Sequence, residues 1–180
     1  KEVLQWREQR PDIIYIFSKD ILRHRRAQKE DAVWLKKGEE YKDETLSVRA
    51  FGSTDVGVSF LLQAGGKKIF HAGDLNNWHW MDESTEAEWK GAEKNFLHEL
   101  DDLYAYTPEV DVAMFPVDPR LGKEYMRGAG QFVTKIKTHI FVPMHFTPEY
   151  AKANAFRDFA EAHGVRFVSL THRGQKIEIE

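Results

Sequence analysis

The sequence predicts a mixed α/β fold in which helices pack on a sheet. Two short apolar runs joined by glycines, Gly57–Gln63 and Lys68–His71, are typical of a β-hairpin. From Ser84 onward, strand-like runs alternate with helical patterns, which favours parallel strands covered by helices. The length of 180 residues suits one domain over residues 1–180 and allows a core without cross-links.

The residues before the hairpin alternate between short helical and strand-like segments. The pattern predicts helices at Glu2–Gln9 and Ile21–Gln28, strands at Asp12–Phe17, Ala32–Leu35 and Thr45–Phe51, and a turn-rich connection at Lys36–Glu44. The first helix ends before Pro11, because proline cannot continue the helical hydrogen bonding.

A polar segment follows the hairpin within Lys67–Trp80, KKIFHAGDLNNWHW. Gly73 permits a sharp turn after the second strand, so Asp74 emerges just beyond its carboxyl end, where sheet-based folds place their ligands. An acid there is a candidate metal ligand or base. The alternative is that Asp74 caps a turn or a helix.

The second half of the chain predicts a regular succession of helices and strands. Five apolar residues recur at spacings of three and four, which is typical of the buried face of a helix: Trp89, Ala92, Phe96, Leu100 and Leu103. This helix is expected to begin near Ser84 and to end before Pro108. The other expected elements are strands at Val110–Pro116, His139–Met144, Arg166–Leu170 and Gln175–Ile179, and helices at Lys123–Lys137 and from Pro148 to about Ala162.

The composition narrows the kinds of site that the chain can build. It has no cysteine, which excludes disulfides, thiolate zinc sites and a cysteine nucleophile, so any metal must be held by histidine and carboxylate. A net charge of −3 argues against a general nucleic-acid binder. No apolar run is long enough to span a membrane and no signal-like segment opens the chain, so we expect a cytoplasmic protein.

Three candidate site residues follow predicted strands: Asp74, Asp118 and His145. If the strands share a direction, these side chains converge on one rim of the sheet. Carboxylate and imidazole are ligands of Zn²⁺, Mn²⁺ and Fe²⁺, and the two together can also form a general-base pair. A catalytic zinc normally takes three protein ligands and a water, so Asp74 and His145 alone would bind weakly.

The motifs GVSFLLQAGGKKIFHAGD, VDVAMFPVD and THIFVPMHF, in this order, resemble the later motifs of the metallo-β-lactamase superfamily, in particular a hydrolase branch similar to ascorbate-6-phosphate lactonase. The resemblance implies an αββα sandwich with divalent metal, zinc first and manganese or iron as alternatives. It implies that Asp74 bridges two metals and that His145 binds one of them. Asp74 and Asp118 are then candidate catalytic residues, and the candidates for substrate binding are Asn76, Asn77, Trp78 and His79. His79 lies between two tryptophans and could equally belong to the core.

Two departures from the family pattern concern the metal ligands. The signature His-x-His-x-Asp-His, which supplies most ligands in the family, is absent from these residues. A further histidine expected before the hairpin is replaced by Ser53-Thr54-Asp55, which makes Asp55 a candidate substitute ligand. We therefore expect the chain to be the C-terminal two-thirds or so of the fold, incomplete at the N-terminus. The alternative is a family member that lost its metals.

The function expected from these features is a metal-dependent hydrolase that uses a metal-activated water on an ester, lactone, amide or phosphodiester. The chain alone is expected to be inactive, because most ligands are missing. The alternative is a non-catalytic binding or structural module that kept the fold and lost the metal site. A di-iron oxidoreductase has little support, since no flavin-binding or electron-transfer segment is visible. The expected partners are a small-molecule substrate and a second copy of the chain, with neither nucleic acid nor membrane.

Overall fold

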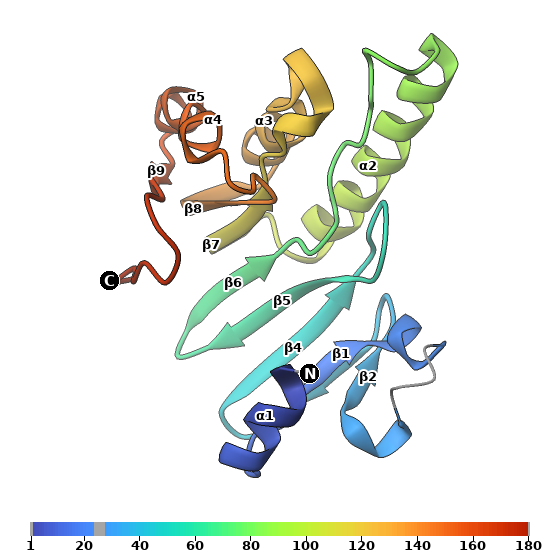
Figure 1. Cartoon of the computed structure of the whole chain (residues 1–180), viewed down its shortest axis with the longest axis vertical. Helices are drawn as coiled ribbons and strands as arrows, with labels where there is room; N and C mark the ends of the chain where they lie inside the picture. Colours follow the sequence, from blue (N-terminus) through green and yellow to red (C-terminus); the bar gives the residue numbers. More distant parts are fainter. Residues whose placement is uncertain (1, 24–27, 180) are drawn as a thin grey trace.

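The computed structural model of the chain describes residues 2–23 and 28–179, with side chains from Gln5 onward, and contains two sheets in this part of the chain (Figure 1). The strands are β1 Ile16–Ser18, β2 Val33–Leu35, β3 Glu40–Lys42, β4 Leu46–Phe51, β5 Ser59–Ala64, β6 Lys67–His71, β7 Glu109–Pro116, β8 Lys137–Met144 and β9 Arg166–Phe167. The helices are α1 Glu2–Gln9, α2 Glu86–Tyr106, α3 Arg127–Lys135, α4 Tyr150–Asn154 and α5 Arg157–Ala162, with 3-10 turns η1 Lys19–Arg23, η2 Lys29–Asp31 and η3 Pro119–Glu124.

The large sheet has the strand order β3-β4-β5-β6-β7-β8-β9, and β1 pairs with β2 in a separate small sheet. Strands β3 to β6 are antiparallel neighbours, whereas β6 to β9 run parallel. The predicted hairpin is confirmed as β5 and β6, joined by Gly65 and Gly66 at φ of 56° and 76°. Two successive residues with positive φ give the turn whose twist matches the strands, and glycine adopts it without steric cost.

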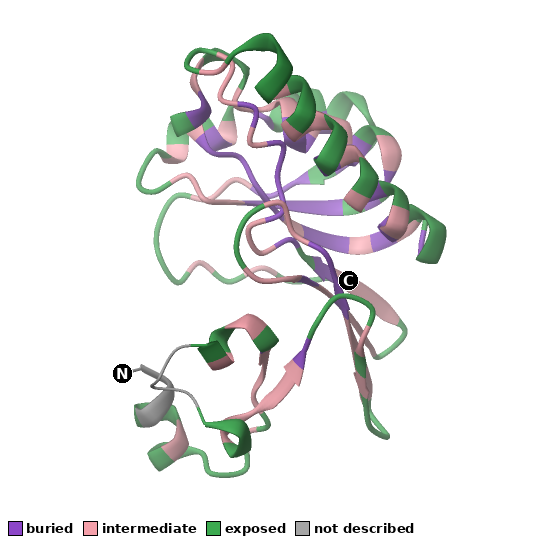
Figure 2. Cartoon of the chain, turned by 90° about the vertical axis from the view of Figure 1, so that its right-hand side faces the viewer, coloured by how far each residue is buried: buried purple, intermediate pink, exposed green. Residues whose placement is uncertain are grey.

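Helices α2, α3 and α5 pack on one face of the large sheet and enclose the main core (Figures 1 and 2). The predicted apolar face of α2 is confirmed for Phe96, Leu100 and Leu103, which are fully buried. Thr85 caps this helix, because its hydroxyl accepts from Glu88 N and the Glu88 carboxylate accepts from Thr85 N at 2.8 Å. Six phenylalanines of this core are fully buried: Phe70, Phe96, Phe115, Phe132, Phe141 and Phe156.

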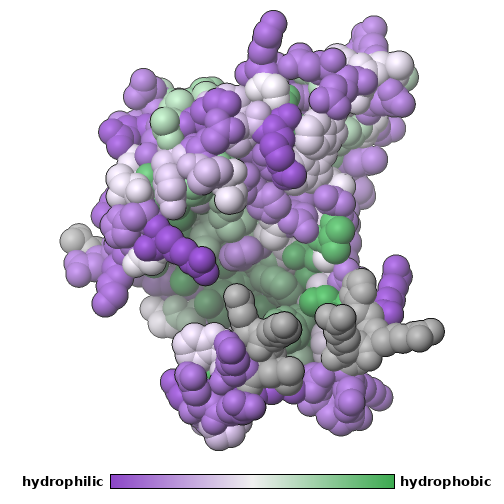
Figure 3. Space-filling view, viewed as in Figure 1, coloured by the Kyte–Doolittle hydropathy of each residue, from purple (hydrophilic) through white to green (hydrophobic). Residues whose placement is uncertain are grey.

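The opposite face of the large sheet carries a second, smaller apolar cluster. Leu62, Ile69, Val112 and Ile140 are in register across β5, β6, β7 and β8. Val168, Leu170 and Ile177 from the last part of the chain pack against this cluster on the β8 side. Figure 3 shows apolar residues lining a hollow between the helix-bearing part of the molecule and its N-terminal part.

Several predicted elements of the first half differ from the structure. The strand expected at Asp12–Phe17 is only the short β1, because it pairs with the three residues of β2 and no others. The helix expected at Ile21–Gln28 is represented by η1, and residues 24–27 lie outside the described part. The connection Lys36–Glu44 contains β3, whose Glu40, Tyr41 and Lys42 pair with β4 although two of the three are charged.

In the second half, the helices are shorter than the sequence pattern predicts. The segment Lys123–Lys137 divides into the end of η3 and α3, with Gly122 at φ 79° inside the 3-10 turn. The segment after Pro148 divides into α4 and α5 at Ala155 and Phe156. The strand predicted at Gln175–Ile179 is absent from both sheets. This segment makes no strand pairing, and Ile177 packs on the second apolar cluster with its side chain. None of the helices in the described residues is long and apolar enough to cross a membrane.

Candidate functional site

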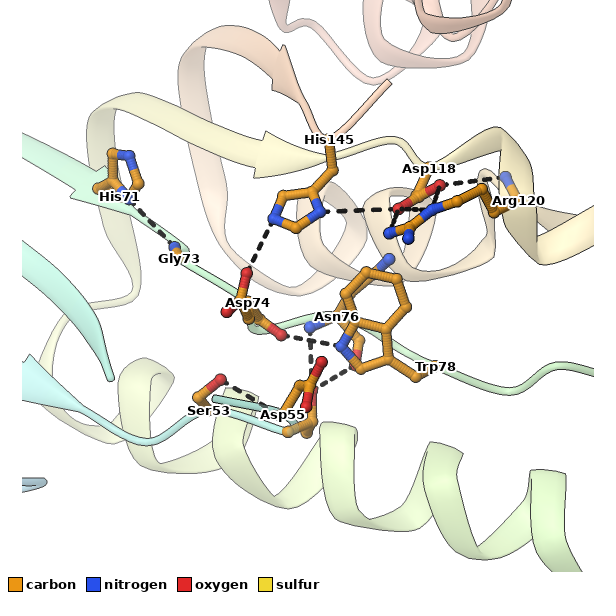
Figure 4. Close-up of polar contacts among 11 residues, drawn as sticks. Ser53, Asp55, His71, Gly73, Asp74, Asn76, Trp78, Asp118, Arg120 and His145 are labelled. Carbon is orange, nitrogen blue, oxygen red and sulfur yellow. Dashed lines mark hydrogen bonds and ion pairs between the residues drawn. The ribbon is translucent and has the colours of Figure 1, made fainter. Parts of the chain in front are cut away.

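Three parallel strands end at the same edge of the large sheet and bring three predicted site residues together (Figure 4). Asp74 follows β6, Asp118 follows β7 and His145 follows β8. His145 Nε2 lies 2.9 Å from Asp74 Oδ1, and His145 Nδ1 lies 3.6 Å from Asp118 Oδ2. The imidazole therefore stands between two carboxylates, one on each ring nitrogen.

The backbone at two of these strand ends is in the left-handed region. Gly73 has φ of 56°, and a Cβ added there would lie 2.8 Å from the carbonyl oxygen of Val58. Only glycine fits this turn, which delivers Asp74 to the sheet edge. His145 itself has φ of 62°, a conformation that costs a residue with a side chain about 1–3 kcal/mol. The backbone of His145 is thus held by its surroundings in a conformation that residues with a side chain rarely adopt.

Asp118 is completely buried, and Arg120 neutralises its charge. The carboxylate accepts from the backbone N of Arg120 at 3.0 Å, from its Nε at 2.9 Å and 3.0 Å, and from Nη2. Burial opposes ionisation, but these hydrogen bonds and the nearby charges of Arg120 and His145 prevail and lower the pKa of Asp118. Asp118 is therefore an ionised anchor shared by Arg120 and His145.

Hydrogen bonds to the backbone of Asp74 and Asn76 hold the segment 74–78 against the rest of the site. Trp78 Nε1 donates to the carbonyl oxygen of Asp74 at 2.8 Å, and the Trp78 ring meets the His145 ring edge-on at 5.8 Å between centroids. Thr54 fixes Asn76 by donating to its carbonyl oxygen at 2.6 Å and accepting from its N at 3.0 Å. This arrangement leaves Trp78 partly exposed as one wall of the site.

A polar network ties the same segment to two helices. Asn77 Nδ2 donates to Glu93 Oε1 at 3.2 Å and to Gln131 Oε1 at 2.9 Å. Glu93 Oε1 also accepts from Arg127 Nε at 2.7 Å and from Gln131 Nε2 at 2.6 Å. The hydrogen bond from Arg127 leads the contributions that lower the pKa of Glu93 against a smaller opposing effect of burial. The network joins the segment to α2 and α3 behind the site.

The four predicted substrate-binding residues divide between the surface and the interior. Asn76 and Asn77 are fully buried, and His79 is 1% exposed with its ring bonded to Glu124 O at 3.1 Å and Met81 N at 3.1 Å. These three make hydrogen bonds within the protein that hold the segment in place, and their contact with a substrate stays a prediction. Trp78 is partly exposed, and its contact with a substrate likewise stays a prediction.

The donors present fit part of a metal site. With ligand distances of about 2.1 Å and a tetrahedral angle, two ligand atoms of one zinc ion lie about 3.4 Å apart, against 2.9 Å between His145 Nε2 and Asp74 Oδ1. These two side chains could share an ion after moving apart by about 0.5 Å. Asp118 cannot join them, since it faces the other ring nitrogen and is bonded to Arg120. Within the described residues, Asp55 does not join them either, and no group of three or more histidine and acidic side chains is placed to hold a metal.

A cavity of about 270 Å³ opens beside His145, and Arg120, which was not among the predicted site residues, forms part of its lining. Its lining includes Asp118, Arg120, His145, Thr147 and Glu149. The side chain of Arg120 is 65% exposed there, although its partner Asp118 is buried. The sequence signal for it was the spacing Asp118-x-Arg120 directly after a predicted strand, which allows a local ion pair.

Comparisons with known proteins find structural but no sequence-level matches. No protein-family model matches the chain, and no curated protein does. Zn²⁺-bound PqqB from Methylobacterium extorquens matches 92% of this chain and 63% of its own length, at 18% identity and a TM-score of 0.51. YhfI from Bacillus subtilis, a metallo-β-lactamase fold protein, matches 86% of this chain and 65% of its own, at 7% identity and a TM-score of 0.50.

A third match is looser. A candidate zinc-dependent hydrolase of the metallo-β-lactamase superfamily from Thermotoga maritima matches 72% of this chain and 58% of its own, at 20% identity and a TM-score of 0.43. The chain spans about three fifths of the length of the structures it matches. The branch similar to ascorbate-6-phosphate lactonase stays a prediction. The mixed sheet with its helices, matched by PqqB and YhfI, shows that the chain has the metallo-β-lactamase fold.

Proposed function

We propose that the chain contributes Asp74 and His145 to the metal site of a hydrolase, and that further ligands lie outside the described residues. The observation that carries this proposal is the contact of 2.9 Å between Asp74 Oδ1 and His145 Nε2 at the carboxyl edge of parallel strands. Support also comes from the fold shared with Zn²⁺-bound PqqB. The assignment of hydrolysis rests on the fold and the resemblance of the motifs, since one fold can host several chemistries.

A metal bound at such a site lowers the pKa of a bound water to about 7 and polarises a carbonyl or phosphoryl oxygen. The substrate classes that suit this chemistry are an ester, a lactone, an amide or a phosphodiester. Zinc is the proposed metal, with manganese or iron as alternatives, because only histidine and carboxylate are available as ligands.

The residues of this chain would orient the site. Asp118 Oδ2 faces Nδ1 of His145 at 3.6 Å and Asp74 Oδ1 faces Nε2 at 2.9 Å, so Nε2 is the ring nitrogen that would share an ion with Asp74. Both oxygens of Asp118 are already bonded to Arg120, so we assign Asp118 a positioning role in place of the catalytic role predicted from sequence. Trp78 limits access of water on the side of the His145 ring that it contacts.

Zinc binding by the chain tests this proposal. We expect zinc to shift the NMR resonances of His145 and Asp74 with weak affinity, Asp74→Asn to abolish the shift at His145, and His145→Ala to abolish the shift at Asp74. His139→Ala is the matched control, because His139 is an exposed histidine bonded to Glu109 on another part of the sheet. Stoichiometric zinc retained after gel filtration would contradict the missing-ligand argument. No zinc-dependent shift at His145 would contradict the metal site itself.

A non-catalytic module is the second candidate function, and one observation favours it. Within the described residues, no metal-holding group of three or more side chains exists. The two candidates differ in one measurable respect. A module that lost its metal site predicts that zinc leaves His145 unaffected, whereas a partial hydrolase site predicts the shift described above.

A further inference from the structure

Arg120 is held rigidly beside His145 yet has one unused edge. Its Nε and Nη2 atoms bond the buried carboxylate of Asp118, and its backbone N bonds the same group. Among the described residues, Nη1 has no hydrogen-bond partner. The side chain of Arg120 is nevertheless 65% exposed and forms part of the lining of the cavity beside His145.

This arrangement differs from that of an ordinary surface arginine. A guanidinium can bond one carboxylate along one edge and still offer two N–H groups along another to a second planar or tetrahedral anion. The conformational entropy of the long side chain is already lost to Asp118, so binding an anion at the free edge orders little more. Asp118 thus presents Arg120 in a fixed position.

The guanidinium of Arg120 is connected to His145 through the carboxylate of Asp118. A single atom, Asp118 Oδ2, contacts Arg120 Nη2 and lies 3.6 Å from His145 Nδ1. An anion on Arg120 would therefore lie on the Nδ1 side of His145, across the imidazole ring from Asp74. Glu149 also lines the cavity, but Lys152 pairs with it at 2.6 Å and reduces its repulsion of an anion.

We propose that Arg120 binds an anionic group of the substrate, a carboxylate or a phosphate, in the cavity beside His145. This inference rests on the proposed function, because it names the substrate class of the same site. Arg120 is then a specificity-determining residue. The alternative is a purely structural role, in which Arg120 neutralises the charge of Asp118 and binds no ligand.

Measuring anion binding by the metal-free chain distinguishes anion binding by Arg120 from a purely structural role. We would titrate the ¹⁵N-labelled chain with inorganic phosphate and with acetate at constant ionic strength and follow the resonances of Arg120, His145 and Thr147. Since a charged, bidentate hydrogen bond is lost, Arg120→Ala should weaken the binding of phosphate or acetate by about tenfold or more. Arg120→Lys keeps the charge without the planar edge and should bind with intermediate affinity.

Lys123→Ala is the matched control, because it removes the same charge from the same segment without being part of the cavity lining. It should retain the wild-type affinity within about twofold, as expected when only long-range, screened charge is changed. If Arg120→Ala fails to fold because Asp118 is left unpaired, Asp118→Asn/Arg120→Ala removes the buried charge and allows the same titration.

The outcomes decide both the proposal and the kind of anion. Tighter binding of phosphate supports a phosphorylated substrate, and equal or tighter binding of acetate supports a carboxylate. Binding by Arg120→Ala as tight as by the wild type, an equal loss in Lys123→Ala, or no binding by the wild type would overturn the proposal. Zinc is absent from the titration, so failure here leaves the zinc test of the hydrolase proposal unaffected.

Discussion

Gly128→Ala tests whether the packing of α3 holds the segment that carries Asp74. A Cβ at Gly128 would lie 2.0 Å from Asn76 Oδ1 and 2.9 Å from the backbone N of Asn77. Asn76 is fully buried and its Oδ1 accepts from Asn77 N at 2.9 Å, so the side chain cannot turn aside without losing that bond. The added methyl group must therefore displace either α3 or the segment.

The expected size of the effect combines two opposing contributions. Alanine is favoured over glycine in a helix by about 1 kcal/mol, whereas forcing an atom into a filled core costs typically about 1–3 kcal/mol. The loss of the hydrogen bond to Asn77 N adds about 1 kcal/mol. We expect a net loss of about 1–3 kcal/mol in the free energy of unfolding, since the clash with backbone cannot relax locally.

Gly91→Ala provides the control within the same chain. Gly91 is in α2, is exposed, and a Cβ there would meet no atom within 4 Å. Helix propensity alone then applies, and the variant should gain about 0.5–1 kcal/mol. Urea unfolding followed by circular dichroism measures both variants. A Gly128→Ala variant as stable as Gly91→Ala would refute the reasoning, because the segment would then yield without cost.

Three further predictions concern the network, pH and association. Glu93→Gln should lower the free energy of unfolding in urea by about 1–3 kcal/mol, because Arg127 loses its charged partner. Glu86→Gln, on the exposed face of α2, is the control and should change it by less than about 0.5 kcal/mol. The carboxylate of Asp43 accepts hydrogen bonds from Thr45 N, the Thr45 hydroxyl and Leu46 N, which lower its pKa from 3.8 to about 2. The ionised carboxylate therefore stabilises the fold above pH 3.8, and this contribution is lost as the pH falls toward 2. A carboxyl ¹³C titration of Asp43 with a midpoint near 3.8 would contradict this prediction. The second apolar face, with Leu62 and Ile69 in register, should cause concentration-dependent self-association in sedimentation velocity, and a monodisperse monomer at all concentrations would count against it.

The strand ends of the site could be predicted from sequence because their signals are local. Gly73 and the apolar run before it mark the end of β6, and similar runs precede Asp118 and His145. Parallel pairing follows from alternating strands and helices, so the convergence of the three side chains needed no further information.

The parts that sequence could not predict depend on contacts between distant segments. Glu93 meets Asn77 and Gln131 across separations of 16 and 38 residues, and each is an ordinary surface type when taken alone. The burial of His79 depends on Glu124 O, again far along the chain. The charged strand β3 escaped prediction because its pairing with β4 outweighs its weak strand propensity.

The candidate site keeps its shape through the polypeptide alone. Gly73 sets the turn before Asp74, the Glu93 network anchors Asn77, and Asp118 fixes Arg120 while facing His145. Each of these interactions joins groups of the polypeptide itself. Asp74 and His145 are therefore placed by the fold, so the proposed binding of an ion would need only a small adjustment of these two side chains. The same reasoning applies to Arg120, whose free edge is already fixed before an anion arrives. If Asp74 and His145 bind a metal ion and Arg120 binds an anion as proposed, the buried Asp118 connects the two functions, because it bonds Arg120 and faces His145.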